Sequence, residues 1–175
     1  MFNKKRYNLK GIGIIVILLT ISTSFCHKEK EDKDFILDLI DSTAKYAEKK
    51  ETSKIVDLMS DDFYTIKDQR KVDIKELLIG YFKKYRGVVI NILSTNIIYI
   101  KSNKAEIESD VSLSKGMSKA LRKIVQYYGD TYRFKIILEK DLNEWKYIYA
   151  EWKYISITDL FPESFKMLKK IFPNI

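Results

Sequence analysis

The spacing of hydrophobic and polar residues changes partway along the chain. In the first half, apolar residues recur every three or four positions, which is typical of amphipathic helices. We expect helices over residues 34–48 and 73–86, with a shorter helix between them that begins after Thr52 or Ser53. This half of the chain is therefore predicted to be helical.

The 73–86 segment has the clearest helical pattern. Asp73 and Glu76 have the spacing of a capping box, and Gly87 stands where a C-terminal cap is expected. Gly80 inside the helix costs about 1 kcal/mol relative to Ala. We therefore expect another element to pack closely against Gly80.

The second half is rich in β-branched and aromatic residues and alternates between apolar and polar positions. We expect long strands over residues 88–101, 104–114, 132–138 and 144–157, and a short strand at 61–66. A straight strand of this length would span about 46 Å at roughly 3.3 Å per residue, so a bend or bulge is expected. Residues 115–128 are ambiguous between a short helix and an amphipathic loop.

Helices followed by an antiparallel meander predict an α+β fold. We expect N-terminal helices packed on a curved, mainly antiparallel sheet of four long strands. A short amphipathic C-terminal helix is expected over residues 162–172, where Pro162 suits the first helical position.

The first 26 residues have the features of an export signal. Basic residues precede an apolar run over 11–21, which is too short for a comfortable membrane span, and small residues follow. The segment from Thr23 to Cys26 resembles the lipobox of bacterial lipoproteins, with Phe25 at a position that is normally small. That resemblance implies acylation of Cys26 and a lipid-anchored location in the cell envelope of a bacterium.

Two alternatives to lipidation stay open. Ser22 and Ser24 also fit the small-x-small pattern of ordinary signal cleavage, which would release a secreted or periplasmic soluble protein starting at Phe25. An uncleaved anchor is the other alternative. With lipidation, the expected organisation is a signal peptide over 1–25, a tether over 26–32 and one domain over 33–175.

Composition excludes several function classes. Of the 32 basic residues, 27 are Lys, and they are dispersed among acidic residues, so no nucleic-acid partner is expected. The chain has one cysteine and one histidine, Cys26 and His27, and both precede the expected domain. We therefore predict no metal site, no cofactor and no Ser-His or Cys-His nucleophile.

The order of elements resembles the nuclear-transport-factor-2-like superfamily, the cone-shaped fold shared with ketosteroid isomerase. The resemblance rests on the segment Leu58 to Tyr64, the capped 73–86 helix and the strand that begins Glu144-Trp145-Lys146-Tyr147-Ile148. It implies a pocket between sheet and helices, and frequently a homodimer through the sheet. No catalytic motif of the superfamily has a counterpart in this chain.

Aromatic residues are the candidates for a ligand pocket, namely Tyr64, Tyr85, Tyr132 and Trp152. The leading hypothesis is a non-enzymatic envelope lipoprotein that binds a small apolar ligand or a protein partner. One alternative is an isomerase- or dehydratase-like enzyme that uses Asp110 with Tyr64 or another tyrosine. Another is a purely structural dimeric surface module.

Overall fold

The computed structural model describes residues 30–115 and 129–160, together with Lys170. A long N-terminal helix covers residues 30–49. The elements that follow are α2 (Thr52–Asp57), β1 (Met59–Thr65), α3 (Lys71–Lys84), β2 (Val88–Lys101), β3 (Lys104–Lys115), β4 (Asp130–Asp141), β5 (Glu144–Ile155) and α5 (Ile157–Leu160). The ambiguous segment over 116–128 and nearly all of the expected 162–172 helix lie outside the described residues.

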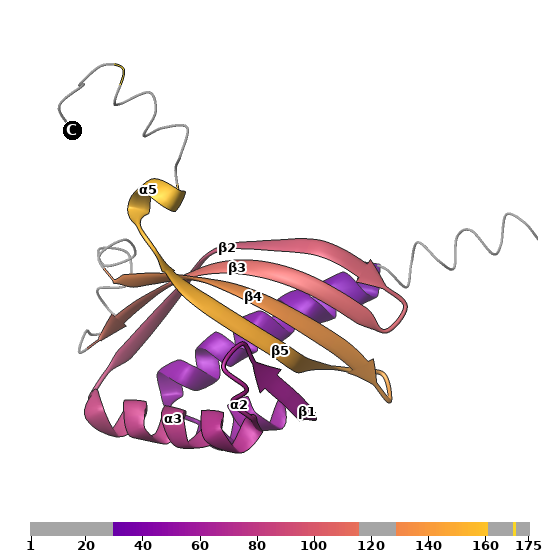
Figure 1. Cartoon of the computed structure of the whole chain (residues 1–175), viewed down its shortest axis with the longest axis horizontal. Helices are drawn as coiled ribbons and strands as arrows, with labels where there is room; N and C mark the ends of the chain where they lie inside the picture. The colour runs from indigo at the N-terminus through magenta and orange to yellow at the C-terminus, as the bar shows by residue number, and fades with distance from the viewer. Residues whose placement is uncertain (1–29, 116–128, 161–169, 171–175) are drawn as a thin grey trace, which may run out of the picture.

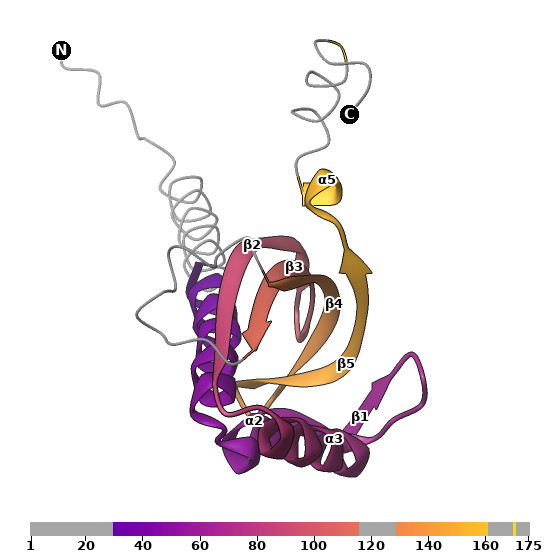
Figure 2. The same ribbon diagram turned by 90° about the vertical axis from the view of Figure 1, so that its left-hand side faces the viewer.

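The strands form one mostly antiparallel sheet in the order β1-β5-β4-β3-β2. Strands β2 to β5 are consecutive antiparallel neighbours, whereas β1 pairs with β5 in parallel. Figure 2 shows β2 to β5 curving around one side of the domain, with the N-terminal helix and α3 on the other side. The predicted α+β fold is confirmed, and the short strand β1 adds a fifth member to the sheet.

The expected irregularity occurs in β2, the longest strand. Its pairing with β3 shifts between Ile92 and Ser94 and again between Ile97 and Tyr99. Each extra residue reverses which side chains face the core, so the inward positions pass from Ile92 to Ile97 to Ile100. The two bulges let a 14-residue strand bend with the curved sheet.

The hairpin turns join the strands where the sequence places them. Ser102 has a positive φ in the β2–β3 turn, and both Leu142 and Asn143 have positive φ in the β4–β5 turn. Two-residue hairpin loops require such conformations because they match the twist of the paired strands. The turns therefore set the register of the sheet.

Three predictions about α3 were wrong. The helix begins at Lys71, and Asp73 is its third residue, so the carboxylate of Asp73 accepts a hydrogen bond from the backbone N–H of Arg70 at 2.7 Å. The helix ends before Tyr85, an extended C-cap residue, rather than at Gly87. Gly80 is exposed, and a Cβ added there would meet nothing within 4 Å. Close packing therefore does not explain this glycine.

The N-terminal helix runs behind strands β3 to β5 in Figure 1, and Asp32 attaches its first turn to the β4–β5 hairpin. Asp32 is buried, and its Oδ1 accepts hydrogen bonds from Lys140 Nζ at 2.5 Å and from Trp145 Nε1 at 3.1 Å. Residues 30–32, part of the expected tether, are thus helical in the structure, and Asp32 packs against the sheet.

Candidate functional site

A cavity of about 430 Å³ lies between the helices and the concave face of the sheet. Every described element except α5 contributes to its wall. The lining residues are Ile40, Thr43, Ala44, Ala47, Ile55, Met59, Phe63, Ile74, Leu77, Leu78, Tyr81, Phe82, Val88, Ile90, Ile92, Ser109, Val111, Leu113, Lys115, Tyr132, Phe134, Ile136, Tyr147, Ala150 and Trp152. Most of these side chains are aliphatic or aromatic, so the cavity suits an apolar molecule.

The strand register explains why these side chains meet. Val111 lies opposite Tyr132, and Ser109 lies opposite Phe134, which in turn lies opposite Trp152. Side chains on directly paired positions share one face of the sheet. Alternation along β3 and β4 therefore gathers their inward residues on one wall, and a shift in the pairing of β5 between Tyr147 and Tyr149 brings Trp152 onto the same wall.

Three hydroxyl groups of the wall donate their protons to oxygen atoms of the protein itself. Thr43 Oγ1 donates to the carbonyl of Leu39 at 2.8 Å, so Tyr147, 2.8 Å away, donates its own proton to Thr43. Ser109 Oγ donates to the carbonyl of Ser94 at 3.0 Å. Burial raises the pKa of Tyr147 well above its ordinary value, since no water reaches the phenolate that ionisation would create.

A polar cluster lies where α3 meets the end of β3. Lys115 Nζ forms an ion pair with Asp130 and lies 5.5 Å from the centre of the Tyr85 ring. The ring of Tyr85 in turn lies 4.7 Å from that of Tyr81, centre to centre. Burial raises the pKa of Tyr81 to about 12, and the hydrogen bond to Asp130 raises the pKa of Lys115. At neutral pH, Tyr81 is therefore neutral and Lys115 is charged.

The four aromatic residues singled out from the sequence lie in different places. Tyr132 and Trp152 line the cavity. Tyr85 is next to the wall, where it packs against the core and against Tyr81. Tyr64 is 41% exposed on β1 and packs against Tyr149 with ring centres 5.1 Å apart, away from the cavity lining.

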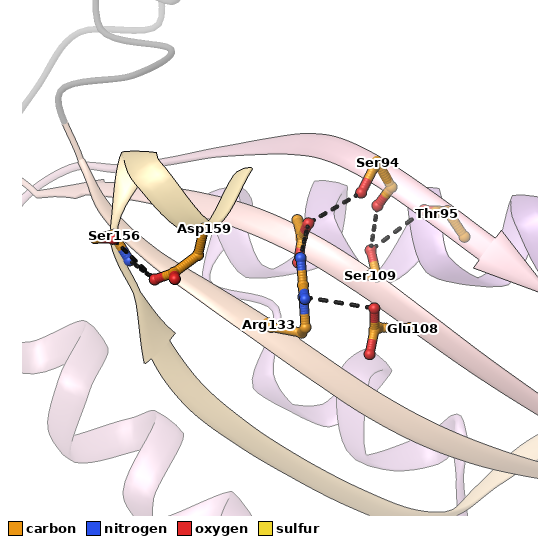
Figure 3. Close-up of polar contacts among 8 residues, drawn as sticks. Ser94, Thr95, Glu108, Ser109, Arg133, Ser156 and Asp159 are labelled. Atoms are coloured by element: carbon orange, nitrogen blue, oxygen red, sulfur yellow. Dashed lines mark hydrogen bonds and ion pairs between the residues drawn. The ribbon is translucent and has the colours of Figure 1, made fainter. Parts of the chain in front are cut away.

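Asp110 lies on the opposite face of the sheet from the cavity. Its carboxylate is 6% exposed and accepts two hydrogen bonds from Arg133, at 2.7 Å from Nε and 2.9 Å from a terminal nitrogen. Ser94 Oγ adds a third hydrogen bond at 3.3 Å, and Glu108 lies 3.5 Å from Arg133 Nε (Figure 3). Asp110 thus has a structural partner in Arg133. Neither Asp110 nor Tyr64 lines the cavity.

The described residues contain neither a metal-binding cluster nor a membrane-spanning helix. Within residues 30–115 and 129–160, no three His, Cys, Asp or Glu side chains are grouped so that they could hold a metal ion. Over the same ranges, no helix has both the length and the hydropathy needed to cross a bilayer.

Comparison with known proteins identifies the fold. No protein-family model matches this sequence, and no curated protein matches it. Solved structures do match, among them a putative scytalone dehydratase from Novosphingobium aromaticivorans, with a TM-score of 0.61 and 12% identity over 74% of this chain and 88% of that one. An NTF2-like protein with a cystatin-like fold from the same organism has a TM-score of 0.57 and 12% identity over 86% of this chain and 92% of that one.

A third similar structure belongs to a longer protein. Bd1075 from Bdellovibrio bacteriovorus has a TM-score of 0.61 and 11% identity over 75% of this chain, which spans 43% of the Bdellovibrio protein. The fold is therefore that of the nuclear-transport-factor-2-like, cystatin-like proteins. Identities this low carry the fold and do not carry an activity.

Sequence reasoning missed the polar cluster and the partner of Asp110. Tyr81 has the helical spacing of a core residue, and Lys115 closes a strand whose continuation was ambiguous. Arg133 lies 23 residues from Asp110, and only the pairing of β3 with β4 brings them together. The available signal was the alternation of the two strands, because aligning them as an antiparallel pair can place Arg133 opposite Asp110.

Proposed function

We propose that this protein is an exported envelope lipoprotein whose domain binds a small apolar molecule without transforming it. The observation that carries the binding half is the cavity of about 430 Å³ with its largely aliphatic and aromatic lining. Ligand sites of small molecules are typically concave, mostly apolar and in the range of about 300–1,000 Å³. The cavity has the size and character of such a site.

The chemistry of the lining supports binding over catalysis. Among the described residues that line the cavity there is no Asp, Glu, His or Cys. The titratable groups there are three tyrosines and Lys115, and Tyr81, Tyr147 and Lys115 have raised pKa values. A general base needs a pKa near the working pH. These three groups hold their protons at neutral pH and do not meet that requirement.

Binding can be measured through the fluorescence of Trp152, which lines the cavity. We expect butylbenzene to produce a saturable change in tryptophan emission. Val111→Phe places a ring inside the cavity and should abolish this change, whereas Val72→Phe, at a position 66% exposed on α3, should preserve it. Equal binding by both variants, or none by the native protein, would rule out the cavity as a binding site.

The export half of the proposal is supported by the sequence from Met1 to Cys26, with its basic start, short apolar run and single cysteine. The lipid anchor is tested by growing cells with a radioactive fatty acid. The native protein should be labelled and Cys26→Ala should not be. Equal labelling of both would refute lipidation, and an unlabelled protein found in the periplasm or medium would favour ordinary signal cleavage.

The enzyme alternative has less support. A catalytic Asp110 would have to act from the face opposite the cavity while both carboxylate oxygens are held by Arg133. The similar structure named as a putative scytalone dehydratase is the one observation that favours this alternative, through its fold alone. A structural dimer through the sheet stays a third proposal, tested by the mass of the purified protein in solution.

A further inference from the structure

Three of the described hydroxyl groups in the cavity wall have no free proton to donate to a ligand. The protons of Thr43, Ser109 and Tyr147 are each given to an oxygen of the protein itself. A polar ligand group placed beside them would lose its hydration without a donor in return, which is costly. The part of the cavity beside them therefore accepts only the apolar portion of a ligand.

Tyr81 differs from those three residues. It lines the cavity, but its hydroxyl is buried and has no hydrogen-bond partner within residues 30–115 and 129–160. A buried hydroxyl without an acceptor has lost its hydrogen bonds to water and gained none from the protein. A ligand acceptor placed next to it would supply the missing hydrogen bond.

Among the described residues, the charged side chains that act on Tyr81 form one ion pair. Lys115 is paired with Asp130, and both lie within electrostatic range of the Tyr81 hydroxyl. A carboxylate ligand would be attracted by Lys115 and repelled by Asp130, and it would lose its own hydration. An uncharged acceptor avoids these costs.

We propose that the cavity takes an uncharged, mostly apolar molecule with one hydrogen-bond acceptor, and that the acceptor is held by the Tyr81 hydroxyl. This inference rests on the proposed binding function. A volume of about 430 Å³ accommodates about 14 non-hydrogen atoms if each takes about 30 Å³, the share of a water molecule in the liquid.

Three compounds of the same shape test the proposal with the full chain. They are 4-butylacetophenone, the anion 4-butylbenzoate and the hydrocarbon 1-butyl-4-isopropylbenzene, each titrated at pH 7.5 against tryptophan fluorescence. We expect the ketone to bind at least tenfold more tightly than the carboxylate. Tyr81→Phe should weaken ketone binding about fivefold, the contribution of one hydrogen bond, and leave hydrocarbon binding unchanged.

Tyr85→Phe is the matched control, because it removes a neighbouring hydroxyl from a ring that does not line the cavity. It should bind all three compounds like the native protein. Equal affinities for ketone and carboxylate in the native protein would overturn the proposal, a result that needs no variant to fold. It would also be overturned if Tyr81→Phe left ketone binding unchanged or weakened all three compounds equally. Failure of all three to bind the native protein would instead refute the binding function itself.

Discussion

Arg133→Met tests whether Asp110 has a structural role. The substitution leaves a carboxylate that is 6% exposed without the two hydrogen bonds that satisfy it. Breaking a fully buried ion pair costs about 3–5 kcal/mol. The cost is lower here because the Arg133 side chain is 27% exposed, so water reaches it. We therefore expect a loss of about 2–3 kcal/mol in the free energy of unfolding.

Urea denaturation followed by circular dichroism measures this loss. With a slope of about 2 kcal/mol/M, the unfolding midpoint should fall by more than about 1 M. Lys135→Met is the control on the same face of the sheet. Its ion pair with Glu106 is 3.3 Å long but its side chain is 45% exposed, so its loss should cost under about 0.5 kcal/mol.

A double-mutant cycle separates the pair from the individual residues. Asp110→Asn removes the charge, and the variant that also carries Arg133→Met should lose less stability than the two single variants combined, by about 2 kcal/mol. Additive losses would show that the two side chains do not stabilise each other. Since the pair lies on the face opposite the cavity, all three variants should bind butylbenzene like the native protein. Loss of binding at native stability would contradict the separation of the two faces.

Three other predictions follow from glycine packing, tyrosine burial and the fixed end of the N-terminal helix. Gly80→Ala should stabilise the protein by about 1 kcal/mol, because the added Cβ meets nothing within 4 Å in an exposed helix. Gly129→Ala should destabilise it by about 1–3 kcal/mol, since the Cβ would lie 2.6 Å from a backbone oxygen of β3. If the urea midpoints of the two glycine variants shifted in the same direction, these two predictions would be contradicted. The pKa of Tyr81 is raised from 10 to about 12, so the folded state binds the phenol proton more tightly than the unfolded state. The free energy of unfolding should therefore fall as the pH rises from about 10 through about 12. Tyr81→Phe should therefore lose less stability than the native protein between pH 10 and 12, and identical pH profiles would show that this group does not titrate as described. Asp32→Ala should raise hydrogen exchange in the first turns of the N-terminal helix, because Lys140 loses its acceptor, and unchanged exchange would refute that role.

The helices and strands were predictable because their hydrophobic periods differ. The bounds of β2 agree with the predicted strand, and the bounds of β3 differ by one residue, because alternation and the turn residues are local properties. The ends of α3 were predicted less well. Asp73 suits a capping role either as the N-cap residue or as the third residue of a helix. In the structure it is the third residue, because the helix begins at Lys71.

The cavity was only partly predictable. Tyr132 follows from alternation along β4, but Trp152 faces the cavity because the pairing of β5 with β4 shifts between Tyr147 and Tyr149. Aromatic character alone could not separate these two residues from Tyr64, which is 41% exposed on the edge strand β1. Tyr64 belongs to the strand that pairs with β5 in parallel, a long-range contact that no local pattern encodes.

By itself, the sequence predicted the α+β class, which the structure confirms, and determined the absence of His and Cys between residues 28 and 175. These are properties of composition and of spacing over a few residues. The export signal stays a prediction. Only the tertiary structure decided that Asp110 is held by Arg133 and that the buried hydroxyl of Tyr81 has no partner among the described residues. The physical reason is that both facts depend on which strands and helices lie against each other, and the cavity wall is assembled from elements that are far apart in the chain.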